Sequence, residues 1–305
     1  MTVNIRKIMI CMVLAVLFLT PVLAYAEETG EDYENVTYLN LDEQRLNYNM
    51  VKSILAKYPN LKKVDMFNVQ LYRNQVEELA SLYPEIEFGW TMKIGKDHTV
   101  RTDATAFSTM HFSNSQPHST ADIAVLRFCK NLKALDIGHN SVNDISWLTE
   151  LPDLRFLIIA INKVTDITPL ASLTKLEYLE MFNNNISDLT PLTGLTHLMD
   201  LNIGYNLITD YTPLYEMTWL KRLWLGKAYK KKNDIPADVI EMLKEKLPNT
   251  QLDWKSNPTM GGWRDHPHHD VIDEMFDYYH QDRMHYVPFS DSFPDLPEDD
   301  EDEDL

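Results

Sequence analysis

The sequence predicts an α/β solenoid, with a curved parallel β-sheet on the concave face, short helices and turns on the convex face, and helix-bearing capping repeats. Two observations predict this fold. Residues 129–150, 151–172, 173–194 and 195–216 share one pattern and follow one another without a gap, which is typical of stacked repeat architectures. Within each repeat, apolar and polar residues alternate over a short stretch, as expected of a strand with one buried face.

Composition and charge exclude several classes of protein. The chain has 305 residues, with 46 acidic against 28 basic side chains and a formal charge of −18. Because this charge repels a phosphate backbone, we expect no nucleic-acid partner. Cysteine occurs only as Cys11 and Cys129, which excludes a disulfide-rich scaffold.

Residues 1–26 have the pattern of a secretory signal peptide. Arg6 and Lys7 precede an apolar run from Ile8 to Leu19, and small residues lead up to Ala26. This order predicts cleavage after Ala26 and secretion of the mature chain. An uncleaved membrane anchor is the alternative, although the run is short for a span of about 20 residues. No second apolar run follows, so we expect no integral membrane segment after cleavage.

Each repeat follows the frame LxxLxxLxLxxNxIxDIxPLxx. The alternating apolar residues, such as Leu135 and Ile137, are expected to point inward from a short strand. An asparagine follows each strand and is expected to satisfy turn backbone groups. The next aspartate is expected to cap the short convex segment, which Thr-Pro then begins in three repeats. These polar positions are Asn140, Asn162, Asn184 and Asn206, followed by Asp144, Asp166, Asp188 and Asp210. Cys129 occupies an apolar position of the frame, which predicts a core residue and not a nucleophile.

The solenoid is expected to extend beyond the strict repeats, to about ten rungs between residues 39 and 254. The expected inward pairs are Leu39/Leu41, Val64/Met66, Ile86/Phe88 and Met110/Phe112 before the repeats, and Leu252/Trp254 after them. Residues 45–60, 71–85 and 234–249 have the apolar spacing of amphipathic helices. The predicted organisation is 1–26 signal peptide, 27–128 N-terminal cap and divergent repeats, 129–226 regular repeats, 227–255 C-terminal cap, 256–294 His/aromatic-rich flank and 295–305 acidic disordered tail.

The flank carries half of the ten histidines, interspersed with aspartates. Because they match no established ligand spacing, we predict no metal and no cofactor. Val271, Met275, Tyr278 and Tyr279 could form one face of a short helix that packs back on the solenoid. A metal-dependent enzyme that uses this His/Asp-rich segment is an alternative hypothesis. The chain shows no nucleophile elbow, zinc-protease or phosphate-loop motif.

The four consecutive units resemble leucine-rich repeats, specifically the 22-residue variety of internalins. The resemblance covers residues 129–226 strongly. It implies a secreted, bacterial, non-enzymatic recognition protein that binds a partner protein through the concave face.

The strand positions that flank the inward residues face this concave sheet, and they are unexpectedly aromatic. We expect this patch to be exposed, and an exposed patch of this kind predicts an interaction surface, because aromatic residues and arginine dominate interface energetics. The candidate partner-binding residues are Phe156, Ile158, Tyr178, Glu180, Phe182, Asp200, Asn202, Tyr205, Arg222 and Trp224. A glycan or other cell-envelope component is an alternative ligand, since aromatic faces also stack on sugars. A further alternative is that the segment after the repeats, residues 256–305, or a long cap loop folds over this face and covers it.

Overall fold

The structure is a computed structural model that describes residues 2–3, 33–42, 44–96, 98–110, 117–226, 235–259, 262–277 and 283–288. Most of the predicted signal peptide and the whole predicted acidic tail lie outside the described residues. The chain divides into two compact units, an N-terminal unit of residues 1–103 and a repeat unit of residues 104–305. None of the helices in the described ranges has both the length and the apolar character needed to cross a membrane.

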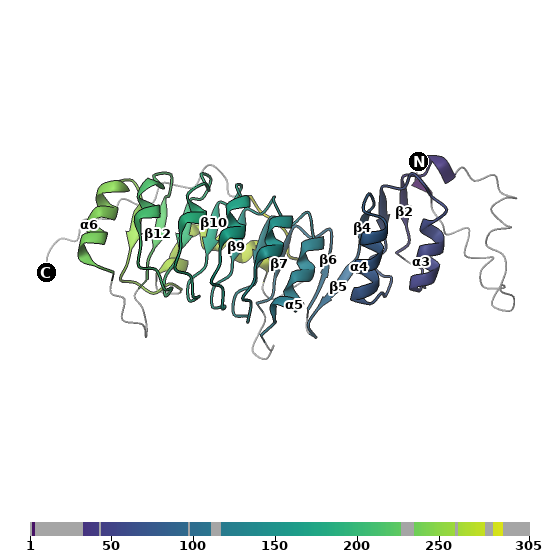
Figure 1. Cartoon of the computed structure of the whole chain (residues 1–305), viewed down its shortest axis with the longest axis horizontal. Coiled ribbons are helices and arrows are strands. Elements are labelled where there is room, and N and C mark those ends of the chain that lie inside the picture. The colour runs from purple at the N-terminus through teal and green to yellow at the C-terminus, as the bar shows by residue number, and fades with distance from the viewer. Residues whose placement is uncertain are drawn as a thin grey trace, which may run out of the picture. The chain divides into compact units, whose positions relative to one another are not determined.

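The N-terminal unit contains a parallel sheet in the order β1-β2-β3-β4, and an antiparallel hairpin of β5 and β6 (Figure 1). Its strands are β1 (Thr2–Val3), β2 (Tyr38–Asn40), β3 (Lys63–Asp65), β4 (Glu87–Gly89), β5 (Thr91–Ile94) and β6 (His98–Arg101). Its helices are η2 (Tyr33–Asn35), α3 (Tyr48–Leu55) and α4 (Arg73–Leu82). Helices α3 and α4 lie within the two segments predicted to be helical, 45–60 and 71–85.

Local capping explains where these two helices begin. The side chain of Asn47 accepts a hydrogen bond from the backbone N–H of Met50 at 3.1 Å, which satisfies one free donor at the start of α3. At the start of α4 the Gln75 side chain accepts from the backbone N–H of Tyr72 at 2.9 Å. Val51 and Val76 lie on the buried faces of the two helices.

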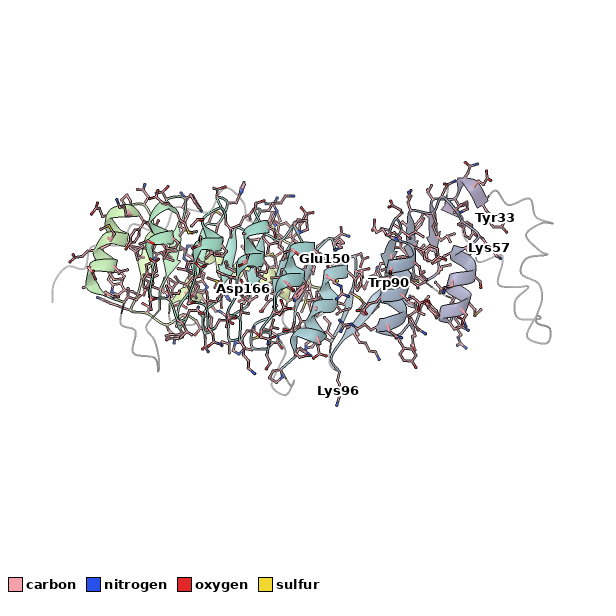
Figure 2. The ribbon with its side chains drawn as sticks, in the orientation of Figure 1. Tyr33, Lys57, Trp90, Lys96, Glu150 and Asp166 are labelled. Atoms are coloured by element: carbon pink, nitrogen blue, oxygen red, sulfur yellow. The ribbon has the colours of Figure 1, made fainter. Side chains whose placement is uncertain are left out.

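The rungs of the N-terminal unit correct one of the predicted registers. Leu39 pairs with Val64, as expected. Val64 then pairs with Phe88 and not with Ile86, so the inward residues of β4 continue with Phe88 and Trp90, whose rings stack 4.7 Å apart (Trp90 is labelled in Figure 2). Counting back by a fixed period fails here because the connection through α4 is longer than that of a regular repeat.

The β5–β6 hairpin interrupts the series of rungs and was not predicted. Residues 91–101 pair antiparallel, Thr91 opposite Arg101 and Ile94 opposite His98. The next rung therefore falls at β7, where Phe107 pairs with Leu135, and the predicted inward pair Met110/Phe112 is wrong. Phe112 itself lies outside the described residues. The expected single solenoid is thus divided between two parallel sheets.

The repeat unit is built on a seven-stranded parallel sheet in the order β13-β12-β11-β10-β9-β8-β7. Its strands are β7 (Ala106–Ser108), β8 (Ala134–Asp136), β9 (Phe156–Ile158), β10 (Tyr178–Glu180), β11 (Asp200–Asn202), β12 (Arg222–Trp224) and β13 (Gln251–Asp253). Equivalent residues of successive repeats lie side by side, for example Leu157, Leu179 and Leu201. The inward positions of the regular repeats are buried, and so is Cys129, which confirms its place in the core.

Short 3-10 helices form the convex side of the regular repeats. They are η4 (Ser146–Glu150), η5 (Thr168–Ser172), η6 (Thr190–Leu192) and η7 (Thr212–Glu216). Each follows a predicted capping aspartate. Asp166, labelled with Glu150 in Figure 2, accepts from the backbone N–H of Thr168 at 2.8 Å, and hydrogen bonds from Thr168 lower the pKa of its carboxyl group. Asp144, Asp188 and Asp210 make the same backbone contact with Ser146, Thr190 and Thr212.

A ladder of buried asparagines joins each rung to the next. The side-chain N–H groups of Asn184 donate to the carbonyl oxygens of Met181 in its own turn (3.1 Å) and Ile159 in the preceding rung (2.9 Å). Its side-chain oxygen accepts from the backbone N–H of Val164 at 3.0 Å. Asn162 and Asn206 repeat this pattern, so backbone groups that the turns leave unpaired are satisfied inside the molecule.

Helical segments end the repeat unit on both sides. At one end lie α5 (Thr120–Ile123) and η3 (Ala124–Phe128), and at the other lies α6 (Ala237–Lys246), within the predicted helical segment 234–249. After β13 come η8 (Trp263–Asp265) and α7 (Pro267–Phe276), which belong to the His/aromatic-rich flank.

We predict that Asn184→Leu lowers the free energy of unfolding by about 3–5 kcal/mol, because it leaves several buried backbone groups unsatisfied. Chemical denaturation measures this change. The same substitution at the exposed Ser187 of the same repeat is the control, and is expected to change stability by no more than about 0.5 kcal/mol. Equal effects at the two positions would contradict the ladder.

Candidate functional site

The concave positions of neighbouring strands lie directly beside one another, as predicted. Tyr178 on β10 pairs with Phe156 on β9 and with Asp200 on β11, and Asp200 pairs with Arg222 on β12. The rings of Phe156 and Tyr178 are stacked with centroids 6.1 Å apart. The sequence-predicted residues therefore form one continuous surface across the sheet.

The prediction that this surface is exposed is wrong. Nine of the ten candidate residues are at most 5% exposed, and Tyr205 is partly buried. Phe156, Glu180, Asp200 and Asn202 have no exposed surface. The reason is that a later segment of the chain lies on the concave face, which is the alternative stated above.

We call this segment the C-terminal flank and define it as residues 257–259, 262–277 and 283–288. Its helix α7 begins where His266 accepts from the backbone N–H of His268 (3.1 Å) and Pro267 occupies the first turn. Of the predicted helix face, Met275 is buried and Val271 is partly buried. Tyr278 and Tyr279 lie outside the described residues. The flank contributes Trp263, Ile272, Met275 and Phe276 to one apolar cluster with Phe156, Tyr178, Phe182 and Trp224 of the sheet.

Trp263 of the flank is enclosed by the concave face, with 1% of its surface exposed. Its ring lies 5.5 Å from that of Tyr178 and 5.7 Å from that of Trp224. The guanidinium of Arg222 lies 4.2 Å from the indole centroid and donates to the carbonyl oxygen of Trp263 at 2.7 Å. Trp263 is thus held by aromatic, cation–π and hydrogen-bond contacts together.

A hydrogen-bond chain connects the indole to a buried carboxylate. The indole N–H of Trp263 lies 2.7 Å from the hydroxyl of Tyr178 and 3.0 Å from Oε2 of Glu180. The Tyr178 hydroxyl donates to the same Oε2 at 2.8 Å. Burial and the neighbouring Glu180 raise the pKa of Tyr178 well above its ordinary value, so the phenol stays a proton donor.

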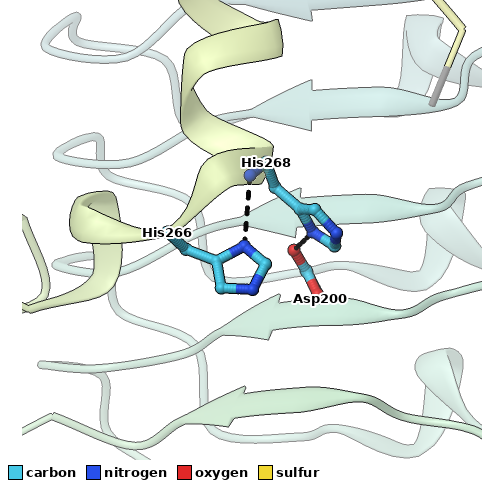
Figure 3. A group of neighbouring side chains, drawn as sticks. All are labelled: Asp200, His266 and His268. Carbon is cyan, nitrogen blue, oxygen red and sulfur yellow. Dashed lines mark hydrogen bonds and ion pairs between the residues drawn. The ribbon is translucent and has the colours of Figure 1, made fainter. Parts of the chain in front are cut away.

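Two buried carboxylates of the concave face, those of Glu180 and Asp200, meet cations or imidazoles. Arg264 of the flank donates to Oε1 of Glu180 at 2.8 Å. The carboxylate of Asp200 accepts a hydrogen bond from the guanidinium of Arg222 at 3.1 Å. It is also in direct hydrogen-bond contact with His268 (Figure 3). These pairings are needed because a buried ion without a partner is strongly destabilising.

Backbone groups and a more distant part of the flank complete the cover. Asn202 donates to the carbonyl oxygen of Pro258 at 3.0 Å, and the indole N–H of Trp224 donates to that of Asn257 at 3.1 Å. Towards the other end of the sheet, the ring of Tyr286 lies 6.0 Å from that of Phe156 on β9, and Sδ of Met284 lies 3.2 Å from the backbone nitrogen of Ser108 on β7. The flank therefore contacts strands from β7 to β12.

Asp200, His266 and His268 have the side-chain types of a metal site, with candidate ligand atoms all within 4.8 Å of one another (Figure 3). Burial, and next the charge of Arg222, lower the pKa of His266 to about 4, so the ring is neutral near pH 7. Its Nδ1 already accepts from the backbone N–H of His268, which leaves the ring proton on Nε2. The direct contact of His268 with Asp200 leaves no space for an ion between them, and Arg222 already neutralises the carboxylate. These contacts fit a role in holding the flank on the sheet better than a role in binding a cation.

Asp136 on β8 is a further buried carboxyl group at a concave position. It accepts from the backbone N–H of Gly138 at 2.8 Å and from the hydroxyl of Ser108 at 3.2 Å. Burial raises its pKa to about 6, against the smaller effects of the Gly138 hydrogen bond and the charge of Arg264. Asp136 is therefore protonated at a higher pH in the folded chain than in the unfolded chain, up to about pH 6.

Sequence reasoning did not identify Trp263, Arg264 or His268 as parts of this site. Their contacts span large sequence separations, 85 residues between Trp263 and Tyr178 and 68 between His268 and Asp200. The available signal was the mixture of aromatic and basic residues in a short segment after the last repeat.

A comparison with protein families identifies the repeats. The family model described as leucine-rich repeats (2 copies) matches residues 130–172, 152–194 and 174–216. These are leucine-rich repeats. The predicted leucine-rich repeat fold, with its parallel concave sheet and short convex helices, is confirmed.

Among solved structures, the chain is similar to internalin C2 of Listeria monocytogenes, with 23% identity over 69% of this chain and 95% of that one, at a TM-score of 0.37. It is similar to the internalin InlF of the same species with 22% identity over 73% and 76%, at 0.39. The ectodomain of the Arabidopsis receptor kinase HAESA, solved in complex with an IDA peptide hormone ligand, shares 21% identity over 67% and 28%, at 0.34. A search of curated protein sequences found no match.

We predict that Asp136→Asn raises stability near neutral pH. The folded pKa of Asp136 lies above its unfolded value. The contribution of Asp136 to the free energy of unfolding is therefore complete below its unfolded pKa. It falls by about 3 kcal/mol as the pH rises to about 6. Asparagine keeps the acceptor for Gly138 without the charge, so unfolding measured between pH 4 and 7 should show a flatter profile than wild type.

The control is Asp166→Asn on the convex side. The pKa of Asp166 is lowered in the fold, so its contribution is present at neutral pH and is lost as the pH falls. Its removal should change the profile in the opposite direction. A profile for Asp136→Asn parallel to that of wild type would refute the proposed titration.

Proposed function

We propose that this chain is a secreted recognition protein whose repeat unit binds a partner protein through its concave face, and that the C-terminal flank occupies this face in the partner's absence. Leucine-rich repeats of this kind are typically non-enzymatic recognition modules. The partner-binding residues of the proposal are the ten named above, from Phe156 to Trp224.

The observation that carries the proposal is that the concave face already holds a stretch of polypeptide through side-chain-specific contacts. Trp263 fills a slot lined by Tyr178, Trp224 and Arg222. Tryptophan, tyrosine and arginine are the residues that most often dominate protein–protein binding energy. A surface that positions its own segment in this way has the chemistry to position a segment of another protein.

The flank is also suited to release. The described hydrogen bonds of Trp263 and His268 go to side chains of the concave face and not to the ladder asparagines, so loss of these contacts leaves the hydrogen bonds of the ladder in place. The described part of the connection from β13 to Trp263 contains turn-forming residues, with Asn257 accepting from the backbone N–H of Thr259 at 3.0 Å. Binding of a partner would then compete with an intramolecular contact, which sets a threshold for recognition.

A variant with a released flank tests the proposal. It combines Trp263→Ser, Arg264→Glu and Met275→Glu, which remove the anchor and place carboxylates against Glu180 and the apolar cluster. Used as bait against protein and polysaccharide fractions, it should retain a protein at least about tenfold better than wild type, because the competing flank is gone. Circular dichroism and thermal unfolding verify that the repeats remain folded.

Two further baits locate the binding surface. Adding Phe182→Ser to the released variant should abolish retention, because Phe182 lies within the concave cluster. Adding Tyr72→Ser, at an aromatic residue that is 77% exposed in the N-terminal unit, should leave it unchanged. Equal retention by all baits would contradict binding at the concave face, and retention from the polysaccharide fraction alone would favour a glycan ligand.

Secretion has its own test. Expressed in a bacterial host with a Sec pathway, the full chain should be recovered outside the cytoplasm with Glu27 as its first residue, as N-terminal sequencing would show. Recovery of the uncleaved chain in the membrane fraction would instead support the alternative of an N-terminal anchor.

A further inference from the structure

The concave positions of the strands carry an unequal set of charges. Asp136, Glu180, Asp200 and Asp253 are acidic, and Arg222 is the one basic residue at these positions of β7–β13. Glu180 and Asp200 have no exposed surface. Any segment that covers this face has to supply positive charge or hydrogen-bond donors, because burying an unpaired carboxylate is strongly unfavourable.

The flank supplies these groups at defined places. Arg264 pairs with Glu180 at 2.8 Å, and His268 contacts Asp200. Arg222 on β12 donates to Asp200 on the adjacent strand and to the carbonyl oxygen of Trp263. The cation that pairs with Glu180 is Arg264, which comes from the covering segment.

The neighbouring slot selects a donor-bearing aromatic ring. The indole N–H of Trp263 reaches both Tyr178 and Glu180, at 2.7 and 3.0 Å. A phenylalanine in this position would fill the slot but leave these acceptors without the donor. The adjacent Arg264 then reaches the other oxygen of the same carboxylate, so one glutamate accepts from two consecutive residues of the flank.

We propose that the concave face recognises a polypeptide segment in which a tryptophan is followed directly by an arginine, and that the flank is an internal copy of this ligand. The inference rests on the proposed function and specifies its partner. The formal charge of −18 of the whole chain adds long-range attraction for a basic partner.

A labelled peptide with the sequence of residues 257–277 tests this specificity. By fluorescence anisotropy it should bind the full-length released variant, and should bind wild type about 100-fold more weakly, because the tethered flank competes at a high effective concentration. Peptides carrying Trp263→Ala or Arg264→Glu should each bind the released variant at least about tenfold more weakly. A peptide carrying Glu274→Gln, at an exposed position of α7, is the matched control and should bind as the parent does.

Charge reversal separates a specific ion pair from general attraction. Adding Glu180→Arg to the released variant should weaken binding of the parent peptide and restore binding of the peptide that carries Arg264→Glu. Equal binding of the parent and Arg264→Glu peptides to the released variant would overturn the inference, and so would failure of the reversal to restore binding to a folded protein.

A measurement on the unaltered chain covers the case in which the variants do not fold. A large molar excess of the parent peptide over wild type should displace the flank and accelerate proteolysis within residues 263–277, whereas the Arg264→Glu peptide should not. Unchanged proteolysis with both peptides would overturn the inference. If the released variant retains a protein partner that the parent peptide fails to displace, the Trp-Arg specificity is overturned but the proposed function is not. If the peptide binds but no protein partner is retained, the specificity stands and the proposed function is overturned.

Discussion

The buried asparagine ladder is the constraint on which the repeat unit depends. Each amide bridges its own turn and the preceding rung, as Asn184 does between Met181 and Ile159. Such a bridge requires successive rungs to have the same length and register, because a buried amide that loses its partners is costly. The ladder thereby places Phe156, Tyr178 and Asp200 side by side on the concave face. The chemistry of that face is a consequence of how the turns are stacked.

A face that mixes aromatic rings with carboxylates makes two demands on whatever covers it. Tyr178 and Trp224 favour an apolar cover, since removal of aromatic surface from water is strongly stabilising. Glu180 and Asp200 favour water or a cation. The flank meets both demands with Trp263, Arg264 and His268. It therefore differs from a general hydrophobic lid, and its sequence describes what the face recognises.

The regular repeats could be predicted because their physical causes lie within a single repeat and its neighbour. Leu135, Asn140 and Asp144 each act on their own turn or on the adjacent one, so periodicity alone assigns their roles. The divergent region was harder. The unpredicted β5–β6 hairpin shifts the next rung to Phe107, and the longer connection before β4 makes Phe88 the partner of Val64. Counting by a fixed period has no means of detecting an inserted hairpin.

By itself, the sequence determined the leucine-rich repeat frame, the inward residues of the regular strands, the capping aspartates and the residues that face the concave side. Whether that concave side meets solvent was decided only by the tertiary structure. The deciding contacts join Tyr178 with Trp263 and Asp200 with His268, and they arise only when the flank returns across the sheet. Periodicity reports which side of a strand a residue faces, but exposure depends on every other segment that packs there. The same aromatic pattern is therefore compatible with an open surface and with an occupied one, and the complementary charges of the flank select the occupied state.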